Sequence, residues 1–114
     1  MIIKSHRFHG SNSLRAVYRH AQTVRGPLIS LKHTANKRSG GYRAAVVVSR
    51  KVSKSAVVRN RIRRRIYEII RRHADGLGPH DLVFTVFGEA VAEQPAAQLE
   101  EAIIELLIKA KVNN

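Results

Sequence analysis

The sequence predicts a single domain of the α+β class, a two-layer α/β sandwich in which helices pack on a central sheet. A chain of 114 residues with 44% hydrophobic content is long enough for one modest core. Segments with helical and strand periodicity follow one another in the order α-β-β-α-β-α, and neither repeats nor a linker divides residues 1–114. A strand, a crossover helix and another strand imply at least one parallel pair.

The first predicted helix covers residues 13–25 and follows a basic lead-in at residues 1–10. Ser11, Asn12 and Ser13 are of the type that caps helices. Glycine and proline at positions 26 and 27 are typical of the end of a helix. We therefore expect this helix to stop at Arg25.

Three strands are predicted, at residues 28–33, 42–52 and 81–88. The polar loop between the first two contains a glycine pair and favours a hairpin. The third strand is almost entirely apolar, which indicates a position inside the sheet and not at a solvated edge. A last helix begins near Pro95 and runs to about Lys111, with an apolar stripe at Leu99, Ile103, Leu106, Leu107 and Ala110.

The segment from Arg50 to Arg72 holds ten of the 21 lysine and arginine residues and a single acid, Glu68. A serine at 53 or 55 caps a helix whose apolar side chains recur on one face, at Val58, Ile62, Ile66, Ile69 and Ile70. With Ile62 at the centre of that face, the side chains expected opposite are Asn60, Arg64, Tyr67 and Arg71. One face is therefore predicted to pack while the rest meets negative charge.

The distribution of charge indicates a polyanionic partner. The formal net charge is +13, and no acid precedes Glu68 whereas 17 basic residues do. Nucleic acid is the commonest such partner. A solvated basic helix face is the plainer alternative, and a membrane-surface helix is disfavoured because the nonpolar face lacks Trp and Phe and is needed for the core.

Other classes of function find little support in the sequence. The absence of cysteine excludes disulfides and thiolate sites, and no residue spacing indicates a catalytic nucleophile or a phosphate-binding loop. His6 and His9 are close in sequence but are expected to belong to a solvated tail, so we predict no catalytic and no metal-binding residue. Without a signal peptide or an apolar span, we expect a cytoplasmic protein with no membrane partner and no small-molecule substrate.

The basic segment resembles the signature of the protein subunit of bacterial ribonuclease P. That pattern is a valine-rich strand ending in two basic residues, then Ala-Val, one residue, and Arg-Asn-Arg followed by further basic residues. This chain has Val46-Val47-Val48-Ser49-Arg50-Lys51, then Ala56-Val57, then Arg59-Asn60-Arg61 with Arg63 and Arg64. Length, charge and the order of the elements agree with the family across nearly the whole chain.

The resemblance implies a protein cofactor of a catalytic RNA that removes the 5′ leader from precursor tRNA. The expected partners are this ribonuclease P RNA and the precursor tRNA, and the expected cofactor is Mg²⁺, held mainly by the RNA. The family fold is ribosomal protein S5 domain 2-like with a left-handed βαβ crossover, which we adopt in place of the generic right-handed expectation.

The resemblance also implies two sets of site residues. The RNA-binding set is Arg50, Lys51, Lys54, Arg59, Asn60, Arg61, Arg63, Arg64 and Arg65. The set lining a cleft for the leader, between the first helix and the sheet, is Arg7, Phe8, Leu14 and Tyr18. Leu14 stands where the family often has phenylalanine, and from periodicity alone both Leu14 and Tyr18 could be core residues.

Two alternatives to this function remain at the level of sequence. A ribosomal or assembly protein that only scaffolds RNA would share the basic helix. A sequence-specific DNA-binding protein would need several base-reading side chains, and Asn60 is the only obvious one on the helix. This chain also departs from the family at Tyr67 and Glu68 and at Phe87-Gly88-Glu89, where the family often has positive charge, so the resemblance carries no RNA contact over to these positions.

Overall fold

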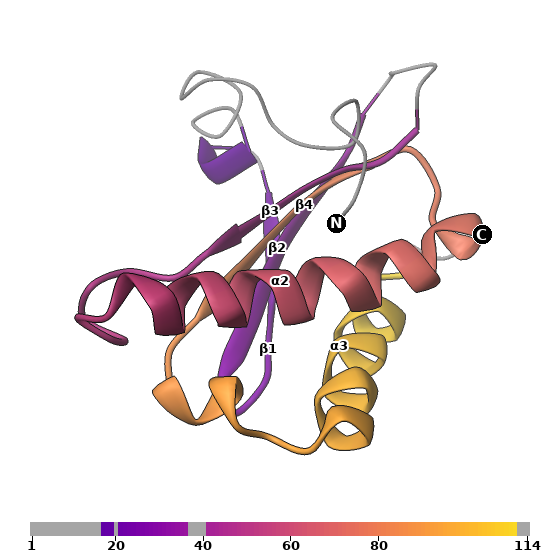
Figure 1. Cartoon of the computed structure of the whole chain (residues 1–114). Coiled ribbons are helices and arrows are strands. Elements are labelled where there is room, and N and C mark those ends of the chain that lie inside the picture. Colours follow the sequence, from indigo (N-terminus) through magenta and orange to yellow (C-terminus); the bar gives the residue numbers. More distant parts are fainter. Residues whose placement is uncertain (1–16, 20, 37–40, 112–114) are drawn as a thin grey trace.

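The protein is described by a computed structural model that covers residues 17–19, 21–36 and 41–111 (Figure 1). Within these residues a four-stranded sheet has the order β1-β2-β4-β3. The strands are β1 (Gln22–Arg25), β2 (Ile29–Ala35), β3 (Arg43–Val47) and β4 (His80–Val86). The helices are α2 (Ala56–Arg72) and α3 (Ala96–Ala110), with short 3₁₀ turns η2 (Ala74–Gly76) and η3 (Glu89–Ala92).

The pairing of the strands confirms the mixed α+β fold class. β2 is antiparallel to both β1 and β4, and β3 lies parallel to β4. α2 therefore forms the crossover between two adjacent parallel strands. The interior position expected for β4 is confirmed as well, whereas the left hand of the crossover stays a prediction.

One face of the sheet packs against α2 and α3, which lie in front of it in Figure 1. Alternate residues of β4 supply its centre, and Leu82, Phe84 and Val86 are all buried. The predicted stripe of the basic helix is buried at Ile62, Ile66, Ile69 and Ile70, and Val58 packs against this core. The stripe predicted for α3 is buried at all five positions.

The helix predicted for residues 13–25 is too long. Val17, Tyr18 and Arg19 are helical, but Gln22–Arg25 form strand β1. Val24 faces Leu31 across the β1–β2 pair and packs against the core, so pairing in the folded sheet overrides the helical period. The Gly26 amide donates to the Ile29 carbonyl (2.9 Å), and the glycine and proline thus turn a hairpin instead of ending a helix.

The hairpin predicted between β2 and β3 is also wrong. β4, which is much later in sequence, lies between these two strands and pairs with both. The core-side apolar residues of β2 and β3 lie opposite those of β4, and such cross-strand pairs stabilise this order of strands. The structure places an additional strand, β1, on the outer side of β2.

A buried carboxylate joins three strands at one end of the sheet. Asp81, only 6% exposed, accepts from Arg43 Nε (2.9 Å) and a terminal Arg43 nitrogen (2.7 Å), and from Asn36 Nδ2 (2.9 Å). The hydrogen bond to Asp81 raises the pKa of Arg43 despite its partial burial. Such a bidentate pair is geometrically specific, so the network fixes how β3 and the end of β2 align with β4.

Stability should fall as the solution becomes acidic, in part because of His33. Burial, together with the nearby His80, lowers the pKa of His33. Its imidazole, with an ordinary pKa near ~6.5 when unfolded, binds a proton more readily in the unfolded chain. The folded state therefore keeps its full stability with respect to His33 above about pH 6.5, and it loses stability as the pH falls below that value. Denaturant titrations at a series of pH values should show a steeper acid loss for the wild type than for His33→Gln, and equal slopes would contradict this assignment.

Candidate nucleic-acid interface

The turn between β3 and α2 presents three cations to solvent. Arg50, Lys51 and Lys54 are exposed, and the described part of the chain provides no hydrogen bond or ion pair to their side chains. Ser55 begins the helix properly, since its hydroxyl accepts from the Val58 amide (3.2 Å), and Ser53 Oγ accepts from the Ser55 amide (3.2 Å). Of the two serines predicted as alternatives, Ser55 is therefore the helix cap, and Ser53 supports the turn before it.

Arg59 stabilises this turn from within the helix. One of its terminal nitrogens donates to the carbonyls of Ser53 (2.9 Å) and Lys54 (3.1 Å). These contacts hold the backbone that carries Lys54, and they leave further N–H groups of the planar guanidinium for an outside acceptor. Arg59 therefore shapes the cationic turn and adds to its charge.

The outer face of α2 carries Asn60 and Arg64, both exposed. Asn60 Oδ1 accepts from Arg63 (2.8 Å), while the other terminal nitrogen of Arg63 donates to the Val48 carbonyl (3.2 Å) at the end of β3. The described residues give Arg64 no partner of its own. Arg64 and the three turn cations thus carry positive charge that nothing in the described chain neutralises.

A second flank of α2 faces η3 and its following turn. Arg61 pairs with Glu93 (2.8 Å), and both side chains remain well exposed. Arg65 is half-buried and donates to the carbonyls of Val91 (2.6 Å) and Gln94. Two of the arginines predicted to bind RNA are therefore engaged within the protein itself.

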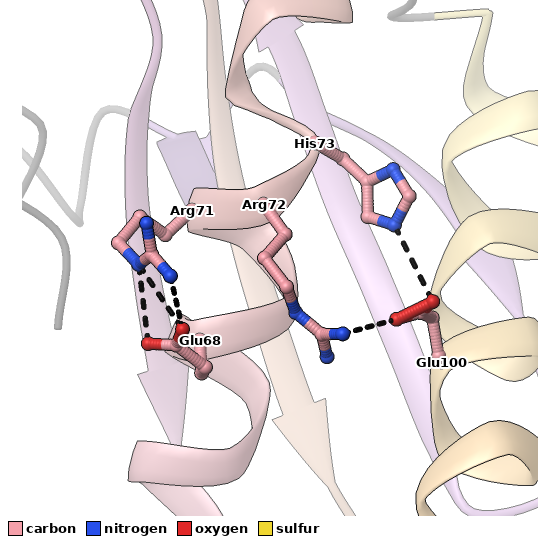
Figure 2. A network of polar contacts seen from close by, with 5 residues as sticks. All are labelled: Glu68, Arg71, Arg72, His73 and Glu100. Carbon is pink, nitrogen blue, oxygen red and sulfur yellow. Dashed lines mark hydrogen bonds and ion pairs between the residues drawn. The ribbon is translucent and has the colours of Figure 1, made fainter.

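The last turn of α2 differs because its arginines have acidic partners (Figure 2). Arg71 binds Glu68 on the same helix, and Arg72 reaches Glu100 of α3 (2.9 Å). The hydrogen bond from Arg71 lowers the pKa of Glu68. His73 Nε2 also points toward Glu100, at 3.8 Å. The end of the helix is therefore far less available to a polyanion than its beginning.

Tyr67 does not lie on the outer side of α2 as its helical position predicted. Its ring packs against the core, and its hydroxyl accepts from the Val46 amide (3.1 Å). β3 is the edge strand of the described sheet, so this contact satisfies a backbone donor that no other described strand reaches.

The sheet face opposite α2 and α3 carries a second polar surface. Tyr18 is 46% exposed, and the Lys32 ammonium lies 5.7 Å from the centre of its ring. Lys32 Nζ also donates to Thr23 on β1 (3.0 Å). Lys32 pairs with Val83, the residue between the core-facing Leu82 and Phe84, which places it on this other face.

Lys32 was missed by reasoning from sequence alone. Its alternation with Leu31 and His33 gives the face it occupies, but its position near Tyr18 depends on the pairing of β1 with β2. Tyr18 is the single member of the predicted leader cleft whose structure is described. Arg7, Phe8 and Leu14 lie outside the described residues.

Two further properties bear on the class of protein. Within residues 17–19, 21–36 and 41–111, no group of three or more histidine or acidic side chains could hold a metal ion. None of the helices in that part of the chain is both long and apolar enough to cross a membrane. Fold and surface together define a small α+β protein built to bind a polyanion.

Comparisons with known proteins identify the family. The family model described as Ribonuclease P matches residues 2–111. A ribonuclease P protein component of Pseudanabaena is 35% identical over 98% of this chain and 97% of its own length, and one of Chloroflexus aurantiacus is 34% identical over 94% and 78%. The chain therefore belongs to the ribonuclease P protein component family.

Solved structures agree with the fold. The RNase P protein of Staphylococcus aureus superposes with a TM-score of 0.85 at 23% identity, covering 97% of this chain and 100% of that one. The Thermotoga maritima protein gives 0.79 at 20% identity, over 90% and 96%. Membership of the family makes this chain a subunit of ribonuclease P, the tRNA-processing endoribonuclease, with RNA as its partner.

We expect Arg59→Ala and Arg61→Ala each to weaken RNA binding and to flatten its salt dependence by about one unit of slope. The reason is that every phosphate contact releases roughly one condensed counterion. Binding measured across a series of salt concentrations gives the slope. Arg61→Lys retains the charge and should keep the wild-type slope, whereas an unchanged slope in the alanine variants would remove these arginines from the interface.

Proposed function

We propose that this subunit binds the catalytic RNA of ribonuclease P and the 5′ leader of precursor tRNA, while the RNA itself cuts the leader. The observation that carries the proposal is a set of exposed cations without partners in the described chain: Arg50, Lys51 and Lys54 in the turn before α2, and Arg64 in the middle of that helix. Guanidinium groups match phosphate oxygens, and like charges so close together are stabilised by an anionic partner.

The remaining basic residues of the segment support this assignment to different degrees. Arg59, Asn60 and Arg63 lie on the same helix as Arg64, and each has hydrogen bonds that hold it there. Arg61 must exchange Glu93 for a phosphate if it binds RNA. Because that ion pair is exposed, such an exchange costs little.

The leader is proposed to lie on the sheet face that carries Tyr18 and Lys32. The exposed Tyr18 ring can stack on a base, and the Lys32 ammonium beside it can meet a phosphate of the same strand. This pairing of an aromatic ring with a cation is typical of single-strand binding. Arg7, Phe8 and Leu14 remain proposed members of this cleft.

Magnesium is proposed to be held mainly by the RNA. Mg²⁺ keeps several waters and is usually bound through phosphates with one or two carboxylates, a role that RNA phosphates suit. The protein's role is then to bind and orient RNA, in the cytoplasm, as one domain over residues 1–114. No protein side chain is assigned a catalytic role.

Reconstitution tests the proposed function directly. The full-length protein, mixed with a bacterial ribonuclease P RNA and precursor tRNA at low magnesium, should accelerate leader removal over the RNA alone. The counterpart outcome, RNA binding without any acceleration, would assign the protein to RNA scaffolding instead.

Tyr18→Ala should weaken binding of the leader-bearing precursor more than binding of mature tRNA, because the stacked base belongs to the leader. Loss of one base–aromatic stack is worth about 1–3 kcal/mol. Affinities of the reconstituted complex for both RNAs provide the measurement, and Tyr18→Phe, which retains the ring, is the matched control. Equal losses for the two RNAs would return Tyr18 to a purely structural role.

A further inference from the structure

The guanidinium of Arg65 satisfies two backbone carbonyls of the connection between β4 and α3. Its two terminal nitrogens donate separately, one to Val91 at 2.6 Å and the other to Gln94. Val91 is fully buried and Ala92 nearly so, which leaves water poor access to the Val91 carbonyl, whereas Gln94 is half-buried. Carbonyls in such a place lose free energy when no donor reaches them.

The same connection carries Glu93, which lies between the two anchored residues in sequence and pairs with Arg61 at 2.8 Å. Arg61 and Arg65 are four residues apart and therefore share one flank of α2. Glu93 is 78% exposed at its side chain and cannot be held there by burial. Its position beside Arg61 follows from the anchoring of Val91 and Gln94 on either side.

We propose that Arg65 is a positioning residue: it binds the Val91–Gln94 backbone to α2, withholds its own charge from RNA, and keeps Glu93 beside Arg61. This inference rests on the proposed use of α2 as the RNA-binding helix. It divides the arginines of that helix by what their side chains already contact, with Arg64 facing RNA and Arg65 facing η3.

The geometry of the guanidinium explains why residue 65 is an arginine and not only a positively charged residue. Two carbonyls in different directions require two rigidly spaced N–H donors, which a guanidinium supplies and a single ammonium does not match. Arg65 as a whole is half-buried, and the aliphatic stem of an arginine can cover apolar surface while its guanidinium bonds elsewhere.

The test compares three full-length variants, Arg65→Met, Arg65→Lys and Arg64→Met. Arg65→Met retains an apolar stem, Arg65→Lys retains the charge, and Arg64→Met removes the same charge from a neighbouring exposed position. Thermal unfolding, amide hydrogen exchange and the salt slope of RNA binding are measured on each, with binding carried out well below the Tm.

Both Arg65 variants should lower the Tm by roughly 5–10 °C, and the Glu93 amide, which donates to the Ala90 carbonyl (3.1 Å), should exchange on the order of tenfold faster. Their salt slopes should stay at the wild-type value. Arg64→Met should keep the Tm and flatten the slope by about one unit.

Two results would overturn the proposal. A wild-type Tm and exchange rate in Arg65→Lys would show that charge alone suffices. A loss of a full unit of slope in Arg65→Met would assign the guanidinium to RNA. Failure of the underlying function is recognised separately, because Arg64→Met would then leave the slope unchanged while the Tm and exchange results for Arg65 keep their meaning.

Discussion

The burial of one isoleucine face of α2 against the sheet determines the direction of every arginine on that helix. Ile62, Ile66 and Ile70 are fully buried, and each such side chain contributes about 1.5–3 kcal/mol when removed from water. This packing offsets the mutual repulsion of the guanidinium groups, which are held in neighbouring turns. With the apolar face fixed, Arg63 reaches the end of β3 and Arg65 reaches η3 and its following turn, while Arg72 reaches α3 and Arg64 faces solvent.

Intramolecular acceptors then decide which positive charges remain for a partner. Backbone carbonyls receive Arg59 and Arg65, and Glu93, Glu68 and Glu100 receive Arg61, Arg71 and Arg72. The acids of the chain all occur from Glu68 onward, and the fold brings several of them to the η3 side and the C-terminal end of α2. Within the segment from Arg50 to Arg72, the positive charge that lacks an acidic partner is therefore concentrated on the turn and first half of the helix, where a polyanion gains most.

Local periodicity was enough to predict the packing faces of α2 and α3, because a helix places residues three and four apart on one side whatever surrounds it. The basic motif could likewise be recognised from the sequence alone, because its residues are contiguous. Pairing between distant strands leaves no such local signal, which is why the sequence predicts helix at β1 and places β2 beside β3. The same limit applies to the site: the carbonyls bound by Arg65 and the ring near Lys32 come from other elements. The helical period gives the direction in which a side chain leaves the backbone, but the guanidinium of a flexible arginine can bind any acceptor within its reach.

The place of β4 between β2 and β3 has a consequence for the order in which the chain can assemble during synthesis. The ion pair of Arg43 with Asp81 joins residues 38 apart, and the whole of α2 lies between them. A growing chain that has not yet reached His80–Val86 can pair β1 with β2, but β3 has no strand beside it. The sheet surface that receives the isoleucines is incomplete for as long as β4 is missing. When the seven residues of β4 emerge from the ribosome, they thus complete both the sheet and the surface on which α2 packs.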